Sequence, residues 1–159
     1  MRGYGHAMIG LLYRTLRSLF FRPPILQVGA LCLRGEGAAT EVLLIRSLDS
    51  NRWIIPKGWP MRGQSLAEAA AIEAWEEAGV RGTIADRPIG SYVYGKRRGS
   101  GVKQKCAVQV FVIEGVTLAK DYPEAAMRYR KWFPTALAAK KLGEPELKRL
   151  IEALSPEMR

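Results

Sequence analysis

The sequence predicts one α+β domain, a mixed sheet with one early helix and two closing helices. Three observations carry this prediction. The chain has 159 residues, which is enough for one compact core and short for two. Apolar or alternating runs of strand length fill much of residues 25–134. A well-delimited helical segment interrupts them at 65–79, and further helical segments follow residue 134.

The first half of the domain is expected to begin with a hairpin. Residues 25–34 (ILQVGALCLR) predict a buried strand and residues 41–47 (EVLLIRS) a second one, with the turn GEGAAT between them. Residues 53–64 predict a short strand that becomes a loop with two prolines and two glycines. Ser65 and Glu68 then form a capping box, and Gly79 is a typical residue after a helix end.

The second half predicts more strands and then the closing helices. Residues 80–98 and 102–116 alternate apolar and polar side chains, which indicates two strands joined by a basic tip at 96–101. Residues 128–134 predict another short strand. Two helices are expected after it, in TALAAKKL (135–142) and PELKRLIEAL (145–154).

Residues 1–24 form a separate basic amphipathic segment ahead of the domain, which is expected to span 25–159. The segment contains no acidic residue, and its apolar side chains between residues 8 and 21 fall on one helical face. Pro23 and Pro24 are expected to act as a hinge. We interpret the segment as a helix that packs on its own domain or on a partner subunit. Peripheral contact of residues 8–21 with an anionic membrane, or organelle targeting, is the alternative.

The amino-acid composition limits the classes of partner and of catalytic mechanism that this chain can have. Lys and Arg number 25 against 15 Asp and Glu, so the formal charge is +10, and the partner is expected to be anionic: a polyphosphate, a nucleic acid or a membrane surface. His6 is the only histidine, which argues against a Ser-His or Cys-His mechanism. Cys32 and Cys106 lie in apolar runs and predict buried free thiols in a reducing, cytoplasmic setting. No apolar run approaches the roughly 20 residues of a membrane span.

The predicted helix at 65–79 carries the candidate chemistry. Glu73, Glu76 and Glu77 stand at i, i+3 and i+4, so their carboxylates share one face of an otherwise mostly apolar helix. No Lys or Arg occurs from Ser65 to Val80 to pair with them. Like charges against a partly buried face are costly unless protonated or neutralised by a cation. Carboxylate oxygens without sulfur or imidazole favour Mg²⁺ or Mn²⁺.

These residues resemble the signature of the Nudix hydrolase superfamily. That signature is Gly, five residues, Glu, seven residues, then Arg-Glu-hydrophobic-x-Glu-Glu-x-Gly-hydrophobic. Gly58 is followed here by Gln64 and then by IEAWEEAGV (72–80), so the spacing is intact over residues 58–80, here called the Nudix box. The flanks WIIPKG and RKWFP look like those of diphosphoinositol polyphosphate and diadenosine polyphosphate hydrolases. The resemblance covers about residues 25–154 and implies an α/β/α sandwich around a mixed sheet.

The resemblance also implies a metal-dependent pyrophosphohydrolase. Glu73, Glu76, Glu77 and the Gly58 carbonyl would hold Mg²⁺ or Mn²⁺, and Glu76, or else Glu73, would serve as general base. Two positions depart from the signature, because Gln64 replaces its first Glu and Ile72 its Arg. The paired replacement leaves no unmatched charge, but it leaves open a non-catalytic module that binds polyphosphates.

The basic residues predict the substrate class. A clamp for phosphates is expected from side chains bordering the box and around the basic tip, namely Lys57, Arg46, Lys96, Arg97, Arg98, Lys103 and Lys105. A second, weaker cluster consists of Arg128, Arg130 and Lys131, of which Arg128 and Arg130 are expected to line one surface of an exposed strand. The favoured substrate is a dinucleoside polyphosphate or an inositol pyrophosphate. An RNA 5′ end is less favoured, because no RNA-binding motif and no aromatic stacking platform is evident.

Overall fold

The computed structural model describes residues 23–97 and 103–154. The predictions for residues 1–22 and for Arg98 lie outside the described residues. The described elements are β1 (Ile25–Arg34), β2 (Glu41–Arg46), β3 (Trp53–Ile54), β4 (Lys57–Gly58), α2 (Leu66–Ala78), β5 (Val80–Ile84), β6 (Gly90–Arg97), β7 (Lys103–Leu118), β8 (Arg130–Pro134), α3 (Thr135–Lys141) and α4 (Pro145–Glu152), with a short 3-10 turn at Gly37–Ala39.

The strands form one mixed sheet in the order β3-β2-β1-β7-β5. Its centre is the parallel pair β1 and β7, which runs from Ile25 opposite Cys106 to Cys32 opposite Ile113. The other pairings are antiparallel, with β4 on β1, β8 on β2 and β6 on β7. The predicted hairpin of β1 and β2 is confirmed, but the two strands pair only next to the turn. The far end of β2 pairs with β3, and β8 pairs with β2 from Glu41 to Ile45.

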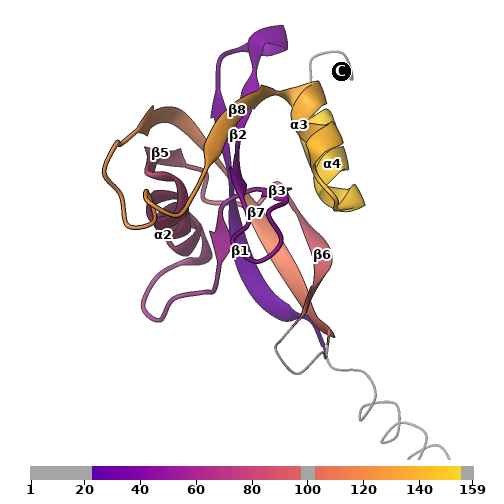
Figure 1. Ribbon diagram of the computed structural model, residues 1–159. Coiled ribbons are helices and arrows are strands. Elements are labelled where there is room, and N and C mark those ends of the chain that lie inside the picture. Colours follow the sequence, from indigo (N-terminus) through magenta and orange to yellow (C-terminus); the bar gives the residue numbers. More distant parts are fainter. Residues whose placement is uncertain (1–22, 98–102, 155–159) are drawn as a thin grey trace, which may run out of the picture.

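Helices cover both faces of the sheet, as expected for an α/β/α sandwich. Helix α2 lies on one face, and α3 and α4 lie on the other (Figure 1). Strand β1 shows why two cores form. Leu31 and Leu33 belong to the cluster that contains α3 and α4 residues, whereas Ala30 and Cys32 pack with Ala74 of α2. Successive side chains of a strand face opposite sides, so an unbroken apolar run such as 28–33 supplies both layers.

The single strand predicted over residues 80–98 is two strands, β5 and β6, which lie along the same edge of β7. Ile84 is opposite Ile113 and Gly90 is opposite Val110, so residues 85–89 bulge opposite two residues of β7. The bulge contains Pro88, which has no N–H to donate to the ladder. In the described part of the chain, no helix combines the length and apolar character needed to cross a membrane.

Candidate active site

Helix α2 is fixed at both ends by its own sequence. The Ser65 hydroxyl accepts from the Glu68 N–H at 3.1 Å, and the Glu68 carboxylate accepts from the Ser65 N–H at 2.7 Å, which confirms the predicted capping box. Gly79 ends the helix with a φ of 63°, a conformation that glycine adopts at least cost. The buried face consists largely of alanines, including Ala70 and Ala74, so the helix can lie close to the sheet.

The connection between β7 and β8 holds the C-terminal end of α2. The Glu124 N–H donates to the Glu76 carbonyl at 3.0 Å, and the Ala119 N–H donates to the Gly79 carbonyl at 2.9 Å. The Arg130 guanidinium donates to the Ala78 carbonyl. The last carbonyls of a helix have no partner within the helix, so these contacts supply the missing donors. They also bring residues 119–130 next to the predicted glutamates.

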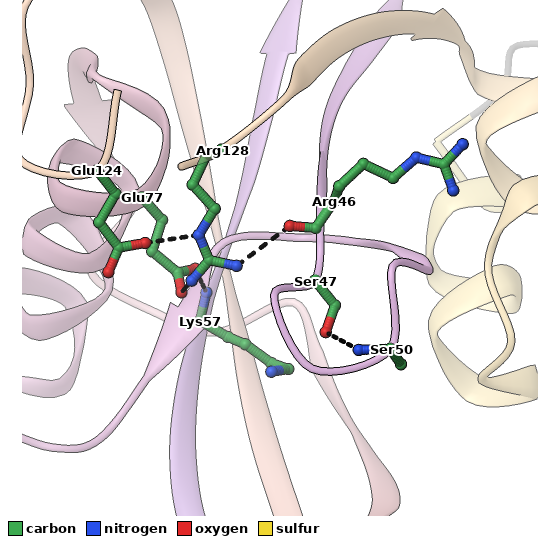
Figure 2. A network of polar contacts seen from close by, with 7 residues as sticks. All are labelled: Arg46, Ser47, Ser50, Lys57, Glu77, Glu124 and Arg128. Atoms are coloured by element: carbon green, nitrogen blue, oxygen red, sulfur yellow. Dashed lines mark hydrogen bonds and ion pairs between the residues drawn. The ribbon is translucent and has the colours of Figure 1, made fainter. Parts of the chain in front are cut away.

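Glu77 lies at the centre of a polar network. One of its carboxylate oxygens pairs with Arg128, and the other accepts from the Lys57 N–H at 2.9 Å. Figure 2 shows Arg128 between Glu77 and Glu124. Burial raises the pKa of Glu77, while the Lys57 hydrogen bond and the Arg128 charge oppose that rise. The counter-charge for Glu77 therefore comes from outside the helix.

The expectation that Arg128 and Arg130 line an exposed surface is wrong. The Arg128 side chain is only 8% exposed and contacts two carboxylates, while the Arg130 guanidinium donates to the carbonyls of Ala78 and Ala119. The alternation of side chains along a strand does not apply to Arg128, because β8 begins only at Arg130. Arg128 precedes the strand, and its N–H closes a turn onto the Glu124 carbonyl at 2.9 Å.

Glu73 lies against the loop that precedes the helix. Its carboxylate occupies the space where a Cβ on Gly58 would stand, so any side chain at residue 58 would displace that carboxylate. The Trp59 N–H lies close to this carboxylate and acts to lower the pKa of Glu73. Burial, followed by the charges of Glu77 and Glu76, raises the pKa of Glu73 to about 7. Glu73 is thus a partly buried carboxyl that a nearby cation would return to its ionised form.

The donor set fits a hard divalent cation. Within residues 23–97 and 103–154, neither Glu73 nor Glu76 has an ion-pair partner, and only carboxylate and carbonyl oxygens are at hand. The described side chains of His, Cys, Asp and Glu do not already form a group of three at metal-binding distance. Glu77 is turned toward Arg128 and Lys57, so cation binding requires small side-chain movements around Glu73 and Glu76.

Lys57 joins the glutamates to a cavity. Its N–H faces Glu77, whereas its side chain extends toward the loop that carries Ser47 and Ser50 (Figure 2). The cavity there has a volume of about 330 Å³, and its lining is mostly polar: Ser47, Asp49, Ser50, Arg52, Ile54, Lys57, Tyr94, Gly95, Lys96 and Glu144. Burial lowers the pKa of Lys57. Its ammonium lies 4.9 Å from the centre of the Tyr94 ring.

The structure divides the predicted phosphate clamp. Lys57 and Lys96 line the cavity, but Lys105 is exposed and stands opposite Gly95, on the other face of the sheet from Lys96. The Arg46 side chain points away from Glu77 (Figure 2), lies over the Trp53 ring and donates to the Asn51 carbonyl at 2.6 Å. The side chains of Arg97 and Lys103, and the whole of Arg98, lie outside what the structure describes.

Two residues that the sequence did not single out belong to this site, Trp59 and Glu124, and Arg128, which the sequence predicted only as an exposed charge, belongs to it as well. The Trp59 side chain is 41% exposed, and the Lys96 ammonium lies 6.0 Å from its ring centre. The position of Trp59 directly after Gly58 is the feature of the sequence that could have identified it as a site residue. Glu124 and Arg128 stand far from the box in sequence, so spacing could not find them. A larger cavity of about 700 Å³, lined by Arg34, Glu36 and Glu114 among others, contains none of the predicted site residues.

The fold and the site together define an α/β/α sandwich that presents glutamates beside a cavity with two lysines. A family model described as the NUDIX domain matches residues 23–154. The chain therefore belongs to the NUDIX domain family.

Curated relatives and solved structures agree with this assignment. The chain is 31% identical over 96 residues to Nudix hydrolase 12, mitochondrial, of Arabidopsis thaliana, covering 58% of this chain and 47% of that protein. It is 30% identical over 118 residues to mouse diphosphoinositol polyphosphate phosphohydrolase 3-alpha, covering 73% and 68%. The chain thus spans about half the length of the first of these relatives. The crystal structure of C. elegans Ap4A hydrolase shares the fold, with a TM-score of 0.55, 20% identity and coverage of 82% and 95%.

Proposed function

We propose that this chain is a divalent-cation-dependent hydrolase of phosphoanhydride bonds in a highly anionic substrate, either a dinucleoside polyphosphate or an inositol pyrophosphate. One observation carries the proposal. Lys57 places its backbone against Glu77 and its side chain in the cavity, so the carboxylate cluster and the cationic cavity adjoin. Hydrolysis of a phosphoanhydride needs both, since a base must act on water while cations offset the charge on phosphoryl oxygens.

The three glutamates of the Nudix box would act as metal ligands, and one of them would also act as the general base. Glu73, Glu76 and Glu77, with the Gly58 carbonyl, would hold Mg²⁺ or Mn²⁺, in keeping with the family's general need for divalent cations. The cation would polarise a phosphoryl oxygen and lower the pKa of a bound water. Glu76 is our choice of base, accepting the proton of the attacking water on its carboxylate, because Glu77 accepts a hydrogen bond from β4 and Glu73 is packed against Gly58.

The cavity orients the rest of the substrate. Lys57 and Lys96 provide positive charge for phosphates, while Asp49 and Glu144 on the same wall repel them. Arg52 is already 3.7 Å from the Glu144 carboxylate. We therefore expect the phosphate chain to run past the two lysines toward Glu73.

Trp59 favours the dinucleoside polyphosphate over the inositol pyrophosphate. Its exposed ring lies beside Lys96, which lines the cavity, and its backbone N–H lies near Glu73, so this residue stands between the two parts of the site. An aromatic side chain stacks on a nucleobase, whereas an inositol ring presents no π-face. Relatives and structural neighbours are named for substrates of both kinds, so their names do not choose between the two.

A substrate panel tests the proposed activity. The full chain is incubated with Mg²⁺ or Mn²⁺ and with dinucleoside polyphosphates, inositol pyrophosphates, triphosphorylated RNA and nucleotide sugars. We expect release of a phosphorylated product from a dinucleoside polyphosphate, no release with a chelator, and about 100-fold or greater loss in the Glu76→Gln variant. Binding without turnover above that variant would instead assign a non-catalytic polyphosphate-binding module. Turnover of RNA alone would move the assignment to RNA 5′ ends.

Substitution of Trp59 separates the two substrate classes. The Trp59→Ala variant keeps the backbone N–H that lies near Glu73 but loses the stacking surface. We expect its KM for a dinucleoside polyphosphate to rise roughly 5- to 100-fold, with kcat little changed. The KM for an inositol pyrophosphate should stay the same, and Trp59→Phe should restore most of the nucleotide affinity. Equal effects of Trp59→Ala on both substrates would contradict the stacking role.

A further inference from the structure

We propose that Arg128 is a positioning residue for the glutamates of the Nudix box. Its guanidinium sets the orientation of Glu77 and joins the β7–β8 connection to helix α2. The inference rests on the metal-dependent site proposed above, but it concerns a residue outside the box.

The contacts of Arg128 extend over three elements. Its Nε donates to the Glu124 carboxylate at 2.5 Å, its Nη2 pairs with Glu77, and its Nη1 donates to the Arg46 carbonyl at 3.2 Å. These partners lie in the β7–β8 connection, in α2 and at the end of β2. A planar guanidinium offers donors in fixed directions, so one side chain sets the relation of all three. All three of its nitrogens are engaged and it is buried, so it is poorly placed to bind a substrate phosphate.

Glu77 is held from two sides as a result. Arg128 takes one carboxylate oxygen and the Lys57 N–H takes the other. Lys57 belongs to β4, which pairs with the central strand β1, so the second contact is anchored to the sheet. A carboxylate fixed at both oxygens keeps one rotamer, and it turns with any displacement of Arg128. Glu77 therefore stands in a defined place beside Glu73 and Glu76.

The helix cannot supply this counter-charge itself. It has no Lys or Arg between residues 65 and 80, and Ile72, at the position of the signature's arginine, lines a hollow with Trp75, Arg81 and Ile113. Three carboxylates at i, i+3 and i+4 repel one another. The guanidinium of Arg128, delivered by the chain 51 residues after Glu77, offsets this repulsion from the side of β2 and the β7–β8 connection.

The affinity for Mn²⁺ distinguishes two roles for Arg128, a positioning residue and a nearby positive charge, because the two roles predict opposite effects of its removal. Removal of a neighbouring positive charge strengthens the attraction of the carboxylates for Mn²⁺. Removal of a positioning residue weakens Mn²⁺ binding, because Glu77 loses its fixed orientation. We expect the Arg128→Met variant to bind Mn²⁺ about 10- to 100-fold more weakly than wild type, measured by electron paramagnetic resonance or calorimetry. At saturating Mn²⁺ its kcat should fall while KM for the substrate stays unchanged.

Two further variants test the role of the guanidinium: Arg128→Lys, which keeps the charge, and Arg130→Lys, which is the control. Arg128→Lys keeps the charge, but an ammonium cannot reach all three acceptors, so this variant should also weaken Mn²⁺ binding. It replaces Arg128→Met as the test if that variant does not fold. Arg130→Lys alters a guanidinium that bonds only to backbone carbonyls of the same region, so it should leave Mn²⁺ binding unchanged.

Three results would overturn the inference. One is Mn²⁺ binding in both Arg128 variants that is as tight as in wild type or tighter. Another is an equal loss of Mn²⁺ affinity in Arg130→Lys, which would attribute the effect to the helix end in general. The third is a wild-type chain that binds no Mn²⁺, and this result alone would also remove the proposed metal site.

Discussion

The Glu73→Gln variant is expected to lose at least about 100-fold in kcat/KM, while its metal-free form becomes more stable than wild type at pH 8. Glu73 lies partly buried beside Glu76 and Glu77, without an ion-pair partner among the described residues. Its charge is therefore useful to a bound cation and unfavourable without one. Glutamine keeps the shape and removes both effects.

The pH dependence follows from the raised pKa of Glu73, which burial and its neighbours bring from 4.5 to about 7. Between these values the folded chain binds more protons than the unfolded chain, so stability falls as pH rises through the interval. The Glu73→Gln variant lacks this titrating carboxyl, so this contribution to the pH dependence is removed. Thermal unfolding in chelator should thus give similar values for both proteins near pH 4.5 and a higher value for Glu73→Gln at pH 8. Mg²⁺ should stabilise wild type at pH 8.

Glu152→Gln serves as the matched control, because Glu152 is exposed on α4, away from the site. It should change neither turnover nor the pH dependence of unfolding. Full activity of Glu73→Gln would remove Glu73 from the site. A stability difference that does not depend on pH would show that its carboxyl is not held near a pKa of 7.

The Gly58→Ala variant is expected to lose about 100-fold or more in kcat/KM although the chain still folds. A methyl group at residue 58 would overlap the Glu73 carboxylate. The backbone cannot easily retreat, because Gly58 pairs with Val28 of the central strand. Glu73 must therefore leave its place beside the Trp59 N–H, which removes a proposed metal ligand without altering any charge. Metal affinity and turnover measure the loss.

Gly63→Ala is the control from the same loop. Gly63 has a φ of 81°, but a Cβ there would meet nothing within 4 Å. Alanine at residue 63 should cost roughly 1 kcal/mol in the free energy of unfolding through backbone strain and leave turnover largely intact. Equal losses of activity in the two variants would mean that loop strain, rather than overlap with Glu73, explains the effect at Gly58.

Local signals in the sequence predicted much of the fold. The capping box and Gly79 place α2 correctly because both act within a few residues of the helix ends. The apolar runs of β1 and β2 are confirmed as buried strands because their faces meet helices on both sides. The strand predicted over 80–98 lies along one edge of β7 as expected, but the sequence did not show that residues 85–89 interrupt it.

The rest of the site depends on contacts between distant residues. Arg128 and Glu77 are 51 residues apart, and no periodicity links them. The absence of a cation within the helix suggested that the glutamates need a metal, whereas the structure shows that a guanidinium already faces one of them. Similarly, the basic residues were grouped by closeness in sequence. Successive side chains of β6 and β7 face opposite sides of the sheet, so Lys96 and Lys105 lie on different faces. Counting charges along the sequence cannot predict this.

The parallel pair at the centre of the sheet affects how the chain folds. Residue 25 pairs with residue 106, so the central ladder can close only after most of the chain is available. Helix α2 lies inside that long loop and can begin to form from its own caps. A nascent chain that stops before β7 thus has a capped helix whose alanine-rich face lacks part of its covering sheet. During synthesis this face of the helix is open to non-native association until β7 is made.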